Sequence, residues 1–341
     1  MARNTLLWSI AGVGAVVAIR ALQRRNQKID FRNKVVVITG GSRGLGLVLA
    51  RQLAREGARI GICARTQEAL DIAAAELRAY GNEVYAHQCD LTNKDQLNGF
   101  FEAVNQQLGP VDVLVNNAGV IMAGPYANTT DDDFHEAMNT NFWAAYHAIN
   151  AVLPDMQRRK EGRIVNVASF GGKVSIPHLL PYSASKFALV GYSEGLRAEI
   201  ARDNIYVTTI CPGLIRTGSP RQAQIRGQHE KEYAWFKIGD SLPGLSVSAE
   251  KVASDIIEAT RYGDAERIVS LPAKFAGAVH GLFPGLVTDT LAFINNMLPD
   301  PSSAGRDSTR KEGKEVETAL SQNALTTLTE EAAKHNNELT P

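Results

Sequence analysis

Short apolar runs alternate with longer amphipathic stretches from residue 31 to residue 272. Several runs are continuous in Val, Ile and Leu, which is typical of parallel strands buried on both faces. They predict strands at Lys34–Thr39, Arg59–Cys63, Glu83–His87, Val111–Val115, Arg163–Val167, Ile205–Cys211 and Arg267–Ser270. The stretches between them predict helices at Leu45–Glu56, Gln67–Tyr80, Lys94–Leu108, Asp131–Arg159, Ser183–Arg202 and Ala249–Tyr262. This alternation predicts an α/β fold: a single doubly wound, Rossmann-type parallel sheet of about seven strands with helices on both faces.

Three later segments depart from this alternation. Residues 218–247 carry aromatic residues without a clear period, and a long insertion beside a site is commonly a substrate lid. Residues 273–298 are apolar around Pro284. They predict a C-terminal helical segment that could cover the core, form a dimer contact or touch a membrane. Residues 299–341 are polar, mixed in charge and poor in aromatic residues, and they predict a mobile tail.

Residues 1–30 combine an apolar run with a basic linker. The 16 residues from Asn4 to Ile19 carry no charge, and four basic residues follow: Arg20, Arg24, Arg25 and Lys28. Residues 4–22 are long enough to span a membrane only if Arg20 snorkels. The basic residues after the run favour a C-terminal side in the cytoplasm. We expect an anchor that holds the protein at the cytoplasmic side of a membrane, with an interfacial helix or a signal peptide as alternatives.

Charge and cysteine content exclude some classes of protein. Lys+Arg and Asp+Glu both number 36, so the formal net charge is 0 and nothing in it favours nucleic-acid binding. The three cysteines lack metal-ligand spacing and fit buried apolar positions in a reducing compartment: Cys63, Cys89 and Cys211. Four histidines are equally scattered, so no metal site is expected: His87, His135, His147 and His178.

The first predicted strand runs directly into a glycine-rich turn and then a helix. The turn reads Thr39-Gly40-Gly41-Ser42-Arg43-Gly44-Leu45-Gly46. Glycines let the backbone turn sharply and approach a pyrophosphate, and the helix N-terminus offers it free N–H groups. After the second strand, where NAD-binding proteins usually place an acid for the ribose 2′-hydroxyl, the chain has Ala64 and Arg65. Arg65 and Arg43 suit a 2′-phosphate, so NADP(H) is predicted over NAD(H).

A second group of polar residues surrounds the helix after the fifth strand. Tyr182 and Lys186 are four positions apart and share one helix face. The unperturbed tyrosine pKa of about 10 is too high for an effective base at neutral pH. A lysine cation one turn away is expected to lower that pKa. Ser169, just after the fifth strand, places a hydroxyl at the same sheet edge, where it could polarise a carbonyl.

Together these motifs resemble the short-chain dehydrogenase/reductase family. The resemblance covers about residues 31–270 and rests on motifs in family order: TGxxxGxG at 39–46, NNAG at 116–119, Ser169, YxxxK at 182–186, and PG at 212–213 with Thr217. It implies that Tyr182 gives or takes the substrate proton, while Lys186 lowers the tyrosine pKa and binds the nicotinamide ribose. Ser169 would hold the substrate oxygen. Asn141, favoured over Asn139 by the small residue that follows at Ala144, would support a proton relay through water.

The resemblance also implies the cofactor contacts. Asp90 would meet the adenine amine, and Asn117 and Gly119 would flank the adenosine ribose. The alternative for Asn116 and Asn117 is a structural role between the central strands. The nicotinamide end would be shaped by Pro212, Gly213 and Thr217. The full predicted set is Gly40, Ser42, Arg43, Gly44, Leu45, Gly46, Arg65, Asp90, Asn117, Gly119, Tyr182, Lys186, Pro212, Gly213 and Thr217.

The reaction implied is hydride transfer between nicotinamide C4 and a carbonyl carbon, expected in the direction of ketone or aldehyde reduction. The sequence looks like family members that act on lipophilic substrates such as steroids, retinoids or acyl chains. Tyr233, Trp235 and Phe236 in the insertion fit such a substrate. Family members also commonly form homo-oligomers through the helices at 131–159 and 183–202. The alternative reading is a non-catalytic NADP(H)-binding sensor or scaffold at a membrane. A sugar-nucleotide epimerase does not fit, because those enzymes have TGxxGxxG in the phosphate loop.

Overall fold

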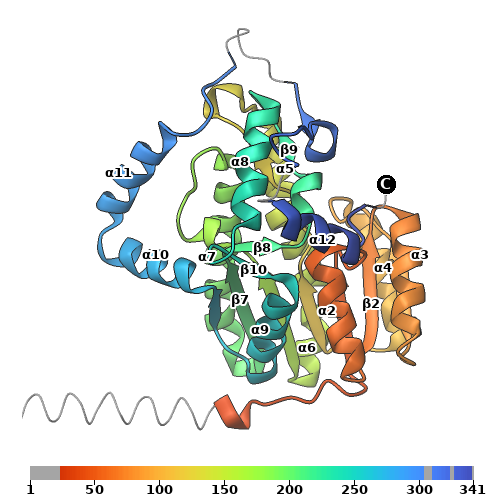
Figure 1. The fold of residues 1–341 in the computed structure, drawn as a ribbon. Coiled ribbons are helices and arrows are strands. Elements are labelled where there is room, and N and C mark those ends of the chain that lie inside the picture. The colour runs from red at the N-terminus through yellow and green to blue at the C-terminus, as the bar shows by residue number, and fades with distance from the viewer. Residues whose placement is uncertain (1–23, 303–308, 323–325, 340–341) are drawn as a thin grey trace, which may run out of the picture.

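The fold is built on a seven-stranded, wholly parallel sheet in the order β11-β7-β6-β4-β1-β2-β3 (Figure 1). The computed structural model describes residues 24–302, 309–322 and 326–339. The sheet strands are β1 (Val35–Thr39), β2 (Arg59–Ala64), β3 (Val84–Gln88), β4 (Val113–Asn116), β6 (Gly162–Val167), β7 (Ile205–Pro212) and β11 (Glu266–Val269). Each predicted strand is present within two residues at either end. The predicted fold class is confirmed.

Helices cover both faces of the sheet, because alternate strand residues point to opposite sides. Val36 and Ile38 of β1 belong to one apolar core, whereas Val35 and Val37 belong to the other. The first core is covered by α2 (Gly44–Arg55), α3 (Gln67–Arg78) and α9 (Ala249–Tyr262). The second is covered by α4 (Lys94–Leu108), α6 (Ala144–Arg159) and the C-terminal half of α7 (Leu180–Ile200).

The helix predicted at 131–159 is continuous but changes its winding in the middle. It begins as α5 (Asp131–Met138), where Thr130 and Asp133 form a capping box. Residues Asn139–Trp143 (η2) form a π-helical turn, after which α6 continues. A π turn inserts one extra residue into an α-helix and is frequent at functional sites. Here it carries Asn141, whose side chain is buried.

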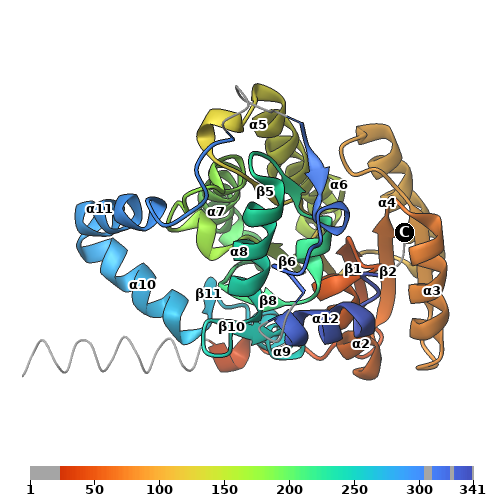
Figure 2. The same ribbon diagram turned by 45° about the horizontal axis from the view of Figure 1, so that its top comes forward.

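The insertion predicted as a lid folds over the carboxyl edge of the sheet (Figure 2). Its main element is α8 (His229–Ser241). Two small sheets flank it, β10 (Ser246–Ser248) with β8 (Leu214–Arg216), and β12 (Lys311–Glu312) with β9 (Gln224–Ile225) and β5 (Met122–Ala123). Short 3-10 turns complete the connections: η1 (Tyr126–Asn128), η3 (Phe170–Gly172), η4 (Ala201–Asp203), η5 (Ser219–Gln222) and η6 (Gly313–Glu315).

The C-terminal third differs from its prediction in one respect. Residues 273–298 are helical as expected, in α10 (Leu271–Leu282) and α11 (Pro284–Asn295), which project from the body as a hairpin (Figure 1). The mobile tail predicted for 299–341 is wrong for its described parts, which form β12 and α12 (Thr327–His335). Thr329 and Ala333 of α12 are buried. The helix is short and its apolar face is made of small residues, so average composition hides it.

The predicted membrane anchor at residues 4–22 lies outside the described residues. Among those that are described, no helix combines the length and apolar character that crossing a bilayer requires. The described chain starts at Arg24, which is fixed to the body. Its guanidinium lies 2.7 Å from an Asp264 carboxylate oxygen and stacks over the Tyr262 ring.

A chain of buried hydrogen bonds joins the central strands to α7. Asn116 Nδ2 in β4 donates to Asn166 Oδ1 in β6 at 2.8 Å, and Asn166 Nδ2 donates to Ser193 Oγ at 2.7 Å. Ser193 Oγ in turn donates to the Leu189 carbonyl at 2.6 Å. All of these side chains are buried. The structural role considered for Asn116 is therefore present.

We predict that Asn166→Ala destabilises the protein by about 2–4 kcal/mol, because it leaves a buried Asn116 amide and the Ser193 hydroxyl without their partner. The measurement is the urea unfolding midpoint and slope. Asn150→Ala, at an exposed position of α6, is the control and should change stability by less than about 0.5 kcal/mol. Equal effects of the two substitutions would contradict the role given to this chain of hydrogen bonds.

Candidate active site

A cleft of about 950 Å³ runs along the carboxyl edge of the sheet. Its walls come from the loops after β1, β2, β3, β4, β6 and β7, with α7, α8 and α10 around them. All the predicted site residues line it except Gly46 and Asn141. Gly46 lies behind the turn, where a Cβ would clash with the Gly40 carbonyl oxygen. Its role is thus to let α2 approach the turn closely.

The glycine-rich turn has the backbone conformation that its sequence predicts. Gly40 and Gly44 have φ of 65° and 55°, in the left-handed region that favours glycine. α2 begins at Gly44, and its N-cap residue Arg43 provides no side-chain cap. The Gly44 N–H donates to the Asn336 carbonyl at 2.8 Å, and the N–H groups that follow it in the first turn of α2 are not capped by the Arg43 side chain. A pyrophosphate fits this cradle.

Asn117 secures the turn from the neighbouring strand. Its side-chain Nδ2 donates to the carbonyls of Thr39 and Gly40 at 3.1 and 3.2 Å. Its backbone N–H donates to Thr39 Oγ1 at 3.0 Å. Asn117 thus ties β4 to the β1–α2 turn while it also lines the cleft, so the two roles considered for this residue coexist in the geometry.

The adenosine end of the cleft is basic where an NAD-selective protein would be acidic. Ala64 and Arg65 lie there at the end of β2, and Arg43 lines the same region from the turn. Asp90, after β3, is also at the wall. One of its carboxylate oxygens accepts hydrogen bonds from the Thr92 N–H and hydroxyl at 2.9 and 2.7 Å. These two contacts leave its other oxygen for an adenine amine.

Tyr182, Ser169 and Lys186 come together at the opposite end. Tyr182 and Lys186 lie on the first turns of α7, and Ser169 follows β6. Ser169 hydrogen-bonds to Tyr182 through its side chain. Ser169 Oγ also accepts the Gly171 N–H at 3.0 Å, which fixes its position. Lys186 Nζ donates to the Val167 carbonyl at 2.9 Å and lies 5.7 Å from the centre of the Tyr182 ring.

Burial changes the acidity of both titratable groups. It raises the pKa of Tyr182, with the Ser169 hydrogen bond acting in the opposite direction. It lowers the pKa of Lys186 to about 8. The lowering of the tyrosine pKa expected from Lys186 is therefore not found: desolvation by burial has the largest effect, and only the Ser169 hydrogen bond opposes it. Tyr182 is a protonated acid at neutral pH.

Asn141 lies beside the first turns of α7, which carry Tyr182 and Lys186. Its Oδ1 accepts the Val120 N–H at 2.8 Å, and its Nδ2 donates to the Val120 carbonyl at 3.1 Å and to Ser185 Oγ at 2.9 Å. A Cβ at Gly119 would come within 2.8 Å of Asn141 Oδ1 and 3.4 Å of Lys186 Nζ. Both polar groups therefore border the small space over Gly119.

The predicted nicotinamide end is formed by residues after β7. The Gly213 N–H donates to the Val269 carbonyl at 3.1 Å, and a Cβ on this glycine would lie 2.9 Å from Ser270 Oγ. Thr217 is buried, and its hydroxyl donates to Ser219 Oγ at 2.8 Å. Pro212, Gly213 and Thr217 all line the cleft as predicted.

Near Tyr182, apolar residues line one part of the cleft, here called the apolar chamber. Its wall is formed by residues of the lid and the adjacent loops: Ile176, Leu179, Trp235, Phe236 and Leu245. Trp235 is held there by Glu232, which accepts its indole N–H at 2.7 Å and also contacts His178 at 2.9 Å. Tyr233 does not reach the chamber. Its hydroxyl donates to Glu317 at 2.9 Å on the other side of α8.

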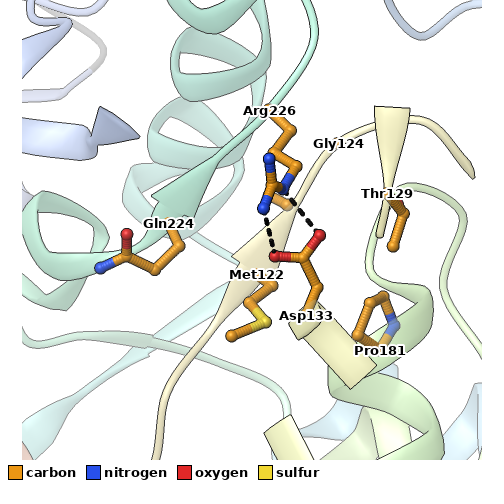
Figure 3. Close-up of a pocket in the computed structure, with 8 residues that line it drawn as sticks. Met122, Gly124, Thr129, Asp133, Pro181, Gln224 and Arg226 are labelled. Carbon is orange, nitrogen blue, oxygen red and sulfur yellow. Dashed lines mark hydrogen bonds and ion pairs between the residues drawn. The ribbon is translucent and has the colours of Figure 1, made fainter. Parts of the chain in front are cut away.

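A second, much smaller pocket lies next to the lid (Figure 3). Its volume is about 10 Å³, barely the space of one water molecule. Arg226 and Asp133 face each other across it, with Nε and Oδ2 2.6 Å apart. This ion pair fastens the lid strand β9 to the start of α5. It is a structural contact and not a second site.

The three cysteines are buried and unpaired, as predicted. Burial raises the pKa of Cys211 to about 12 and that of Cys89 to about 11, so these thiols stay protonated and unreactive.

Sequence patterns did not identify the residues that the C-terminal third brings to the cleft. Ala273 and Ala276 come from α10, and Glu338 follows α12. Asp240 of the lid also lines the cleft, and burial raises its pKa to about 8. None of these residues belongs to a recognised sequence motif. Only the folded structure shows that they line the cleft.

Comparison with known proteins supports the same family. Residues 34–226 match the family model described as short chain dehydrogenase. A putative ketoacyl reductase from Streptomyces coelicolor is 40% identical over 230 residues, which are 65% of this chain and 87% of that protein. Dehydrogenase/reductase SDR family member 7B from Bos taurus is 34% identical over 283 residues, which are 80% of this chain and 85% of that protein.

Solved structures agree with these relatives. A crystal structure of an actinorhodin polyketide ketoreductase variant with NADPH is 34% identical with a TM-score of 0.62, and the match covers 70% of this chain and 95% of that chain. L-Sorbose reductase from Gluconobacter frateurii, complexed with NADPH and L-sorbose, is 26% identical with a TM-score of 0.63, covering 71% and 97%. The motifs, the parallel sheet and the matched family model together establish that this chain belongs to the short-chain dehydrogenase/reductase family.

Proposed function

We propose that this oxidoreductase uses NADP(H) to interconvert a lipophilic ketone or aldehyde and the corresponding alcohol, and that it works as a reductase. One observation carries the proposal. A partly buried tyrosine, hydrogen-bonded to a serine and one helical turn from a buried lysine, lines a cleft of about 950 Å³ together with the glycine turn and apolar residues of the lid. The NADPH in the two matched reductase structures supports the choice of cofactor.

The cofactor is held at both ends of the cleft. The N–H groups at the start of α2 would hold the pyrophosphate, and Arg43 and Arg65 would hold the 2′-phosphate through guanidinium N–H groups. Asp90 would contact the adenine amine, while Asn117 and Gly119 would border the adenosine ribose. Pro212, Gly213 and Thr217 would shape the nicotinamide end, and Lys186 would bind the nicotinamide ribose. When bound, the nicotinamide supplies a hydride from its C4 position.

The protein's own part is to hold the carbonyl and to supply a proton. Ser169 Oγ and Tyr182 Oη donate hydrogen bonds to the carbonyl oxygen, which favours negative charge on that oxygen. Because burial raises the pKa of Tyr182, the phenol still carries its proton at neutral pH and passes it to this oxygen. Lys186, charged below its pKa of about 8, stabilises the resulting phenolate. Asn141 positions water for reprotonation.

The apolar chamber supports a lipophilic substrate of the steroid, retinoid or acyl type. Trp235, Phe236 and Leu245 offer apolar surface beside Tyr182, and each buried methylene contributes about 0.8 kcal/mol to binding. Residues 4–22 would attach the enzyme to the cytoplasmic face of a membrane, where such substrates concentrate. We also infer a homo-oligomer. Half-exposed aromatic residues on the faces of η2 and α7, Trp143 and Phe187, suit a contact between copies.

Tyr182→Phe removes the proton donor and keeps the ring. We expect a loss of NADPH-dependent reduction of at least about 10²-fold, with NADPH affinity nearly unchanged. Steady-state rates and fluorescence titration measure the two properties. Tyr126→Phe, at a position 73% exposed, is the matched control and should leave both unchanged. Turnover that survives Tyr182→Phe would show that another group gives the proton.

Arg65→Glu replaces a guanidinium of the 2′-phosphate site with a repelling carboxylate. We expect kcat/KM for NADPH to fall about 10- to 100-fold, since a charge-assisted hydrogen bond is worth about 1.5–3 kcal/mol. The value for NADH should fall less or rise. Arg158→Glu, at a side chain 75% exposed, makes the same charge change away from the cleft and should alter neither value. A parallel loss with both cofactors would argue against 2′-phosphate recognition by Arg65.

Chain length of the substrate tests the apolar chamber. Across straight-chain methyl ketones, kcat/KM should rise about fourfold per added methylene until the chamber is full. Leu245→Asn, on the chamber wall, should flatten this rise, whereas Leu286→Asn, exposed on α11, should not. A kcat/KM that does not depend on chain length in the unaltered enzyme would contradict the lipophilic assignment.

A further inference from the structure

The C-terminal segment returns to the edge of the sheet where the cleft lies. α12 packs between the lid helix α8 and the phosphate helix α2 (Figures 1 and 2). Lys237 of α8, fully buried, pairs with Glu330 of α12. Ser241 Oγ donates to Thr329 Oγ1 at 2.5 Å. α12 also packs closely against the start of η5. A Cβ at Gly218, the residue before η5, would meet the Ala333 backbone. α12 is thus a docked element.

The residues after α12 reach the phosphate turn itself. The Asn336 carbonyl accepts the Gly44 N–H at 2.8 Å, which is the first N–H of α2. Asn337 Nδ2 donates to the Ser42 carbonyl at 3.0 Å. Glu338 Oε1 lies 2.7 Å from the position that a Cβ on Gly44 would take. The segment therefore contacts the same backbone that is expected to cradle a pyrophosphate.

Glu338 brings a carboxyl group to the predicted anion site. Its side chain is 3% exposed, and its Oε2 lies 3.7 Å from Arg43 Nε, one of the two predicted 2′-phosphate ligands. Within the described residues, Oε2 has no hydrogen-bond partner. Burial raises the pKa of Glu338 to about 7, and Arg43 acts in the opposite direction. The Glu338 carboxylate resembles a phosphate in this place, but its Oε2 makes no hydrogen bond within the described residues.

We propose that residues 336–338 are an internal competitor of the cofactor phosphates, held over the phosphate turn by α12 and displaced when NADP(H) binds. The proposal rests on the NADP(H) assignment above. Asn336 occupies an N–H that the pyrophosphate requires, and Glu338 occupies the neighbourhood of Arg43 that the 2′-phosphate requires. Two anions do not share such a site, because their repulsion adds to the cost of desolvating each.

The energetics favour release of residues 336–338 from the phosphate turn, while α12 stays docked. A buried acid with an unpartnered oxygen destabilises the closed arrangement, whereas a phosphate can satisfy the turn and Arg43 together. α12 keeps its own contacts with α8 through Lys237 and Ser241. The segment therefore lowers the apparent affinity for the cofactor without having to unfold.

The test is a titration of the full-length protein with NADPH, followed by nicotinamide fluorescence. If only the open fraction binds, removing the competitor raises apparent affinity by the inverse of that fraction. Glu338→Gln keeps the shape and removes the charge, and we expect its Kd for NADPH to fall about three- to tenfold. Glu331→Gln, at an exposed position of α12, is the matched control and should leave Kd unchanged.

Hydrogen exchange gives a second readout that does not need the variant. Saturating NADPH should speed amide exchange at residues 336–338 relative to the free protein. Unchanged or weaker NADPH binding by Glu338→Gln, or slower exchange at these residues on binding, would overturn the competitor. Slower exchange on binding would instead indicate that residues 336–338 hold the bound cofactor in place. Failure of every version to bind NADPH would instead overturn the cofactor assignment, and the competitor with it. Neither readout depends on the identity of the carbonyl substrate.

Discussion

Parallel pairing of the central strands is the constraint on which the rest of the structure depends. β1, β4 and β6 lie side by side in parallel register, with Ile38 opposite Val115 and Val115 opposite Val165. Their carboxyl ends therefore share one edge of the sheet, and each crossover helix begins at that edge. The same rule brings the turn at Gly40 and the hydroxyl of Ser169 to one cleft, although they are far apart in the sequence.

The segments that cover this edge of the sheet control how far the polar groups of the cleft are exposed to water, and exposure affects their pKa. The lid helix α8, the helix α10 and Glu338 after α12 line the cleft, so its polar groups lose much of their contact with water. Desolvation keeps the proton on Tyr182 and makes Lys186 less basic. Carbonyl reduction needs these two states, a protonated phenol and a cation beside it. The C-terminal third, which has no recognised motif, thus contributes residues to the walls of the cleft that holds the motif residues.

The sequence predicted those parts of the molecule that follow from local pattern. The strands are continuous apolar runs, and the glycine turn and the Tyr182–Lys186 pair have fixed spacings, so all were found in place. The π turn at Asn141 was not predicted, because one extra residue in a helix leaves no compositional trace. α12 was not predicted, because the buried face of this helix consists of Thr and Ala and its average composition is polar. The tyrosine pKa was misjudged because burial depends on distant segments.

The most direct test of the central claim is a reduction with NADPH that carries deuterium at the transferred C4 position. In the presence of a long-chain methyl ketone, the account predicts one deuterium on the carbinol carbon of the product and none on its oxygen. The oxygen takes its proton from Tyr182 and so from solvent. NADPH oxidation without labelled alcohol, or label that is lost to water, would contradict hydride transfer to a carbonyl in this cleft.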